Sequence, residues 1–187
     1  MRTEKKYDEQ FNNEKYILQK IHNKGNFPPL YEVLVDDEYY YYIEGLMGFS
    51  LKQLYDLCFK KFCLLTVMNI GIDVIKNFEI LHWSGFVHRD LKPDNLAFGP
   101  LCPENYDYRN DIGILDFGNA KILQKRNGSL NYSSNFVRRC GSKVFSSTNA
   151  LKNRDTLPKD DLESLFYILI YFFNGSLPWY DPQIKNQ

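Results

Sequence analysis

The sequence predicts an α+β fold in two lobes, a small lobe that contains strands and a larger lobe that is mainly helical. Two short runs of aromatic and β-branched residues, 30–35 and 39–43, predict a pair of strands. Two longer apolar segments, 64–83 and 160–173, have the length and spacing of helices.

The boundary between the lobes is expected at the segment "IEGLMGFS", because two glycines in eight residues indicate a flexible connector. This divides the chain into an N-terminal part, 1–43, and a C-terminal part, 44–187. Before the strands, apolar residues at helical spacing over 9–23 predict a helix that ends ahead of Gly25.

Turn and cap residues support these elements. Asp36 and Asp37 predict a hairpin turn between the two strands. In the second strand, alternate tyrosine rings of the run 39–42 are expected to pack against the core. Ser50 and Gln53 form the pattern of a capping box, so a helix is expected from there to about residue 59.

The helix over 64–83 is predicted from six apolar residues at helical spacing and from Gly85, which follows it as a stop signal. These six are Leu65, Met68, Ile72, Ile75, Phe78 and Leu81. Short strands are expected near 96–98 and at 112–116, on either side of a polar loop. The Ser-, Asn- and Arg-rich stretch 124–143 predicts a long loop.

The helix over 160–173 is unusual because its residues 165–173 are apolar or aromatic on every face. A helix of this kind is normally buried on all sides. Only polar and turn-like residues follow it, so we expect a larger domain or a partner protein to cover it.

Composition narrows the class of protein. Among 187 residues, 23 basic and 23 acidic side chains balance, so no overall field attracts nucleic acid or an anionic membrane. The charged N-terminus is unlike a signal peptide, and the longest apolar run is too short to span a bilayer. The four cysteines lack the spacing of a zinc site. We expect free thiols and an intracellular protein, cytoplasmic or nuclear.

The segment "HRDLKPDN", residues 88–95, contains the groups that phosphoryl transfer requires. Asp90 can orient an attacking hydroxyl and accept its proton, and Lys92 can offset charge on the phosphate oxygens. Asn95, together with Asp116 of "LDFG", offers the hard oxygen ligands that Mg²⁺ prefers. A glycine after Asp116 would permit a sharp turn. Both motifs, in this order, are a specific signature of phosphoryl transfer.

On these motifs the chain resembles the Ser/Thr protein kinases, since Lys92 stands two residues after Asp90. The segments "NLAFG", "CGSKVFSSTN" and "DDLESLFYILIYFFNGSLPW" look like the casein kinase 1 group, closest to its tau-tubulin kinase branch. In that group a Ser-x-Asn tripeptide replaces Ala-Pro-Glu, and here it is Ser147-Thr148-Asn149. The resemblance implies ATP and Mg²⁺ as cofactors and protein Ser or Thr as substrate.

The resemblance also implies roles for further residues. Glu14 matches the helix αC glutamate that pairs with the ATP-positioning lysine, and Asp161 matches the buried aspartate that anchors the catalytic loop. The resemblance also implies that His88 has a structural role. The adenine site would consist of the hinge and a floor residue, namely Glu44, Leu46, Met47 and Ala97.

The family pattern places a Gly-rich loop and a lysine ahead of Glu14, and several helices after "GSLPW". No GxGxxG precedes Glu14, the family spacing puts the lysine just ahead of Met1, and Lys5 or Lys6 would have to substitute for it across a shortened connection. We therefore expect a kinase domain truncated at both ends, with 1–43 as the remnant of the N-lobe and 44–187 as the hinge and front part of the C-lobe. The alternatives are a pseudokinase-like binding scaffold without catalysis, or a fragment of a longer kinase.

Overall fold

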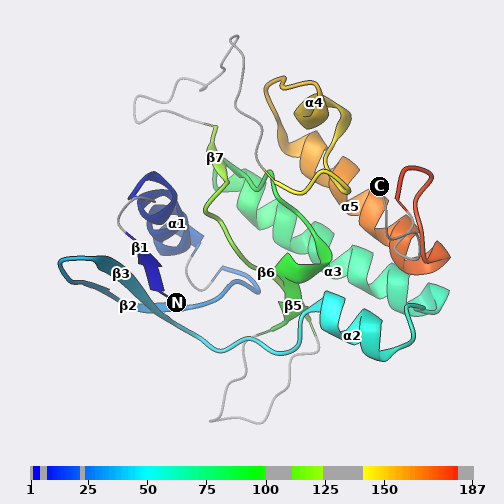
Figure 1. The fold of residues 1–187 in the computed structure, drawn as a ribbon, viewed down its shortest axis with the longest axis horizontal. Coiled ribbons are helices and arrows are strands. Elements are labelled where there is room, and N and C mark those ends of the chain that lie inside the picture. Colours follow the sequence, from blue (N-terminus) through cyan, green and yellow to red (C-terminus); the bar gives the residue numbers. More distant parts are fainter. Residues whose placement is uncertain (1, 5–7, 22–23, 100–110, 124–140, 181–187) are drawn as a thin grey trace.

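The computed structural model describes residues 2–4, 8–21, 24–99, 111–123 and 141–180 (Figure 1). It confirms the α+β class, with one small antiparallel sheet near the N-terminus and most helices in the remainder of the chain. Most of the polar loop after residue 99 and most of the predicted loop 124–143 lie outside the described residues.

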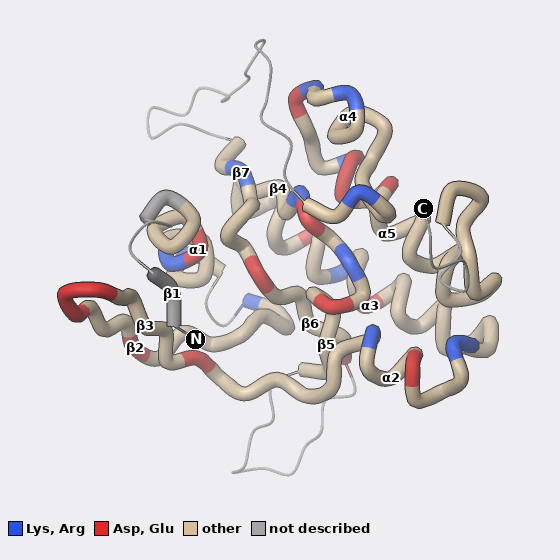
Figure 2. Tube along the Cα trace, in the orientation of Figure 1, with Lys and Arg blue, Asp and Glu red and all other residues tan. Residues whose placement is uncertain are grey.

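The N-terminal sheet has three antiparallel strands in the order β1-β3-β2, namely β1 (Arg2–Glu4), β3 (Tyr39–Glu44) and β2 (Leu30–Val35). The two predicted strands are confirmed. The third strand, β1, was not predicted, because three polar or charged residues carry no strand pattern. The tip of the β2–β3 hairpin is acidic (Figure 2). There, Asp36 Oδ1 accepts the amide hydrogens of Glu38 and Tyr39.

The predicted N-terminal helix is α1 (Asp8–Ile21), and it packs on this sheet through the side chain of Phe11. The Phe11 ring stacks on Tyr40 and Tyr42, with centroids 4.1 and 4.6 Å apart. The Tyr42 hydroxyl donates to the Phe11 carbonyl at 2.7 Å. Alternate tyrosines therefore face the core, as the strand pattern predicted.

Three helices form the framework of the C-terminal part: α2 (Leu51–Leu57), α3 (Leu64–Trp83) and α5 (Pro158–Asn174). The capping box predicted at the start of α2 is present, with both of its hydrogen bonds. Helices α3 and α5 lie side by side (Figure 1). Their shared core continues to α2 through Tyr55, whose hydroxyl donates to the Tyr171 carbonyl at 3.0 Å.

Two short strand pairs connect these helices to the rest of the core. Strand β5 (Leu96–Phe98) pairs with β6 (Ile112–Ile114), in agreement with the expected strands around the polar loop. Strand β4 (Phe86–Val87) pairs with β7 (Lys121–Ile122), which was not predicted. A short helix, α4 (Thr148–Leu151), was not predicted either.

The apolar residues that indicated α3 do not all face the core. Phe78 and Leu81 are buried, but four others are exposed on one side of the helix: Leu65, Met68, Ile72 and Ile75. Helix α5 is likewise covered only in part, because Phe166 is 60% exposed. The partner or further domain that would cover it stays a prediction. Within the described residues, no helix has the length and apolarity needed to cross a membrane.

The β5–β6 hairpin is closely packed at Gly113. A Cβ atom added there would lie 2.5 Å from the backbone oxygen of Asn26 and 2.6 Å from Met47 Cε. Backbone atoms cannot move aside as a flexible side chain can, so the site requires glycine.

We expect Gly113→Ala to lower the free energy of unfolding by about 2–3 kcal/mol, because the added methyl overlaps the Asn26 backbone. Urea denaturation measures this loss. Gly118→Ala is the matched control, since its nearest neighbour would be 3.5 Å away, and its effect should stay within about 0.5 kcal/mol. Equal losses in both variants would contradict the packing argument.

Candidate active site

Asp161, a buried carboxylate at the start of α5, anchors the backbone at the beginning of the segment 88–95. Its Oδ2 accepts the amide hydrogen of His88 at 2.8 Å, and its Oδ1 accepts that of Arg89 at 2.9 Å. The anchoring role that the resemblance implied for Asp161 is therefore present in the geometry.

His82, in the last turn of α3, also contacts this carboxylate, with Nε2 2.8 Å from Asp161 Oδ2. From the sequence, His82 has no assigned role and is expected at the surface or at a helix end. It does lie in the last turn of α3, but its imidazole is mostly buried and bridges α3 to α5. The one feature of the sequence that bears on His82 is its position next to Leu81 in an apolar helix, and this position does not indicate which residue the imidazole contacts.

His88 has a structural environment, as expected. It is fully buried, its Nε2 lies 2.9 Å from the Leu115 carbonyl oxygen, and its ring meets the edge of Phe117 at a centroid distance of 5.4 Å. These contacts join the segment 88–95 to the segment that carries Asp116. The two motifs are therefore packed directly against each other.

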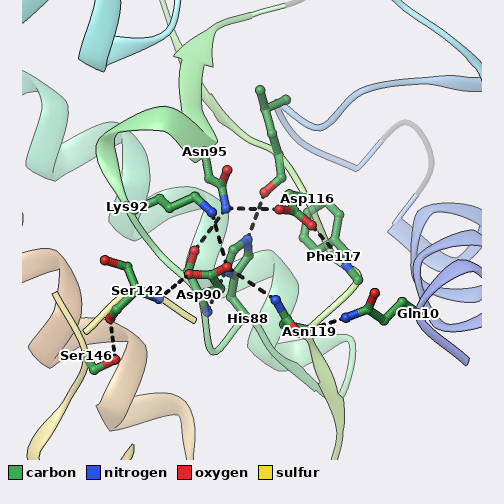
Figure 3. Close-up of polar contacts among 12 residues, drawn as sticks. Gln10, His88, Asp90, Lys92, Asn95, Asp116, Phe117, Asn119, Ser142 and Ser146 are labelled. Atoms are coloured by element: carbon green, nitrogen blue, oxygen red, sulfur yellow. Dashed lines mark hydrogen bonds and ion pairs between the residues drawn. The ribbon is translucent and has the colours of Figure 1, made fainter. Parts of the chain in front are cut away.

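The four residues assigned to phosphoryl transfer converge (Figure 3). Lys92 Nζ lies 3.3 Å from Asp90 Oδ2. Asn95 Nδ2 donates to the Asp90 carbonyl at 3.0 Å and lies 3.5 Å from Asp116 Oδ2. Because Asp90 and Asn95 are buried while Lys92 is partly exposed, the Asp90 carboxylate and the Asn95 amide are held in place and the ammonium group borders solvent.

The turn at Asp116 differs from the expected one. Asp116 itself has a φ of 64°, in the left-handed region, whereas Gly118 does not. Asp116 can take this conformation because aspartate tolerates it better than most residues and because the Gly118 amide donates to Asp116 Oδ1 at 3.3 Å. The sharp turn is thus made one position before the DFG phenylalanine.

Asp90 also receives a hydrogen bond from a segment far along the chain. The Ser142 amide donates to Asp90 Oδ1 at 2.9 Å. Gly141 makes this approach possible, because its φ is 85° and a Cβ atom there would lie 2.7 Å from the Arg89 carbonyl oxygen. The sequence did not indicate this contact, since 52 residues separate its partners.

Glu14 lies in α1 and faces the same site. Its Oε1 accepts the Phe117 amide hydrogen at 3.0 Å. Burial raises the pKa of Glu14 to about 7, and the negative charges of Asp116 and Glu44 act in the same direction, against the Phe117 hydrogen bond. Among the described residues, no lysine or arginine forms an ion pair with Glu14.

Of the residues expected to contact adenine, Glu44, Leu46 and Met47 lie at or just after the end of β3, and Ala97 lies in β5. Glu44 ends β3, and burial, with a smaller contribution from the charge of Asp116, raises its pKa. Leu46 is 72% exposed and Met47 is half-buried. Ala97 is buried in β5. Their contacts with adenine stay predictions.

The donor set suits magnesium. Asn95 and Asp116 offer an amide oxygen and carboxylate oxygens, and Mg²⁺ commonly takes one or two protein ligands while keeping phosphate oxygens and water. Within the described part of the chain, no group of three or more His, Cys, Asp or Glu side chains is arranged to hold a metal. Through these oxygens, Asn95 and Asp116 would suit an Mg²⁺ ion that is bound together with the phosphates of a nucleotide.

We expect Asp161→Ala to lower the free energy of unfolding by about 2–4 kcal/mol, because two backbone amides at buried or half-buried positions would lose their acceptor. Chemical denaturation measures this loss. Asp56→Ala removes a carboxylate from an exposed pair with Lys52 and should cost less than about 1 kcal/mol. A loss at Asp161 no larger than at Asp56 would refute the anchoring role.

The raised pKa of Glu14 predicts a pH dependence of stability. Between the ordinary value of 4.5 and about 7, the folded protein binds more protons at Glu14 than the unfolded chain does. Its contribution to the free energy of unfolding therefore falls as the pH rises through this window, by about 3 kcal/mol in total.

Glu14→Gln should remove this fall, so that the variant becomes more stable relative to the wild type at pH 8 than at pH 4.5. Urea denaturation at several pH values tests this, with exposed Glu79→Gln on α3 as the matched control. Parallel curves for Glu14→Gln and the wild type would exclude a shifted Glu14.

Comparison with known protein families agrees with this geometry. A family model described as the protein kinase domain matches residues 1–187, which is the whole chain. The motifs 88–95 and 115–118 lie within the match and form the site described above. The chain therefore belongs to the protein kinase family.

Proposed function

We propose that this chain is a Ser/Thr protein kinase domain of the casein kinase 1-like type, which transfers the γ-phosphate of ATP to Ser or Thr of a protein. The observation that carries this proposal is the series of contacts that joins four residues: Lys92 contacts Asp90, and Asn95 contacts both Asp90 and Asp116. These residue types are the ones that phosphoryl transfer uses.

In the proposed reaction, Asp90 orients the substrate hydroxyl and receives its proton at a carboxylate oxygen. Lys92 places its ammonium group beside that carboxylate, where it can also offset charge on the transferred group. Asn95 and Asp116 would hold Mg²⁺, which neutralises phosphate charge when it is bound with ATP. The backbone bonds to Asp161 keep the Asp90 segment in place during these steps.

The casein kinase 1-like type rests on the resemblance and is supported by the contacts of its Ser-x-Asn tripeptide. Ser147 caps helix α4, accepting the Ala150 amide hydrogen at 3.2 Å, and donates to Asp160 at 2.7 Å. Thr148 bonds Glu163 through its amide and its hydroxyl. The tripeptide thereby connects α4 to α5. Serine and threonine specificity is proposed from Lys92.

Three further parts of the proposal come from the sequence. We propose the division into an N-lobe part, 1–43, and a hinge with C-lobe part, 44–187. We also propose adenine contacts with Glu44, Leu46, Met47 and Ala97, and an intracellular location. The free thiols Cys58 and Cys63, both exposed, are compatible with that location.

One observation favours a second candidate function, a pseudokinase-like scaffold without catalysis. Glu14 has no cationic partner among the described residues, and burial raises its pKa to about 7. A scaffold would use its surfaces to bind other proteins, and the exposed apolar residues of α3 and α5 are suited to such contact.

Nucleotide binding separates the two candidates. A site competent for Mg-ATP should raise the melting temperature by several degrees at millimolar nucleotide, because ligand binding stabilises the folded state. Asp116→Asn should abolish this shift, since it removes a charged magnesium ligand. If the wild type shows no shift, the catalytic candidate fails and the scaffold is favoured.

The catalytic role of Asp90 predicts that Asp90→Asn lowers kcat by at least about 100-fold in a radiolabelled phosphate transfer assay. Asn retains the shape of the side chain but cannot accept the proton. The Mg-ATP thermal shift should persist, because Asp90 is not a proposed nucleotide ligand. Asp94→Asn, exposed in the same segment, is the control. Comparable activity of Asp90→Asn and the wild type would exclude the assigned role.

A further inference from the structure

The turn 117–120, which follows Asp116, is held by one face of α1. Asn13 Nδ2 donates to the carbonyl of Ala120 at 2.6 Å and to that of Phe117 at 3.3 Å. Glu14 accepts the Phe117 amide hydrogen. Asn13 and Glu14 are consecutive residues of one helical turn, and together they bind both ends of the 117–120 backbone.

Asn119 lies inside this turn and connects it to Asp90. Its Nδ2 donates to Asp90 Oδ2 at 3.3 Å, and its Oδ1 accepts from Gln10 Nε2 at 3.4 Å. Figure 3 shows these side chains in a row, from Gln10 through Asn119 to Asp90 and on to Ser142. Gln10 stands one turn before Asn13 and Glu14, so the same face of α1 reaches Asn119 as well.

The two oxygens of Asp90 are held differently. Oδ1 accepts a backbone hydrogen from Ser142, whereas Oδ2 is contacted by Lys92 and Asn119. The long Lys92 side chain has several rotatable bonds and is 28% exposed. Asn119 is short and belongs to a turn whose backbone is bonded to α1. It is therefore the more rigid of the two donors to Oδ2.

We propose that Asn119 is a positioning residue for Asp90, and that α1 acts through Asn119 on the orientation of this carboxylate. The turn 117–120 is bonded to α1 through Gln10, Asn13 and Glu14. These bonds fix the position of the Asn119 side-chain amide, which in turn orients Asp90 Oδ2 by its hydrogen bond. A displacement of α1 would move the turn and so remove the hydrogen bond from Asn119 to Asp90 Oδ2. The catalytic part of this inference rests on the proposed function of Asp90.

The test compares Asn119→Leu with the wild type. Leucine keeps the branched shape of asparagine but donates no hydrogen bond, so kcat should fall about tenfold. The KM for Mg-ATP should stay within about twofold, because Asn119 is not a nucleotide ligand. Asn12→Leu, an exposed change of the same kind on α1, should leave both parameters unchanged. If Asn119→Leu does not fold, Asn119→Ala replaces it.

A second readout does not require activity. If Asn119 orients Asp90, its loss should weaken the bond from the Ser142 amide to Asp90 Oδ1. Amide hydrogen exchange at Ser142, followed by NMR on the unliganded full chain, should then become at least about threefold faster. Exchange at the Val67 amide, within α3, should not change.

The two readouts distinguish the failure of this inference from the failure of the proposed function. Lower kcat together with faster Ser142 exchange supports the inference. If the wild type transfers no phosphate, the proposed function fails, and Ser142 exchange alone decides whether Asn119 positions Asp90. Unchanged Ser142 exchange overturns the inference whatever happens to kcat, and so does a change confined to the KM for Mg-ATP.

Discussion

The buried carboxylate of Asp161 is the constraint on which the rest of the site depends. It accepts the amide hydrogens of His88 and Arg89, and it does so from the first turn of α5. Arg89 has a φ of 72°, a conformation that costs a non-glycine residue about 1–3 kcal/mol. The hydrogen bond to Asp161 offsets this cost, so the strained backbone that aims Asp90 is maintained by the helical core.

A second support reaches the site from the opposite side, through α1. Glu14 and Asn13 bind the backbone of the turn after Asp116, while α5 holds the backbone before Asp90. The segments that carry Asp90 and Asp116 are therefore held by two helices that are distant in sequence. The geometry of the site depends on how those helices pack as well as on its own short loops, because backbone groups of both loops are bonded to side chains of α1 and α5.

The features that sequence analysis missed have a common physical cause. Asn13, Asn119 and His82 are polar residues of ordinary types. Each contacts a partner that is distant in the chain, 107, 29 and 79 residues away respectively. Strand β1 is polar and short, so it is a strand only because β3 offers its edge. The exposed stripe on α3 has the same helical spacing as a core stripe, and spacing cannot say which of two apolar faces is buried.

By itself, the sequence determined the elements whose signals are local: the hairpin around Asp36, the capping box of α2, the length of α3, and the motifs that contain Asp90 and Asp116. Propensity, caps and motif spacing act within a few residues, and they are readable for that reason. Only the tertiary structure decided which donors surround Asp90, that Glu14 meets the Phe117 amide, and that Asp116 makes the turn. Those outcomes depend on long-range packing and on the dielectric environment that it creates, which no local pattern encodes.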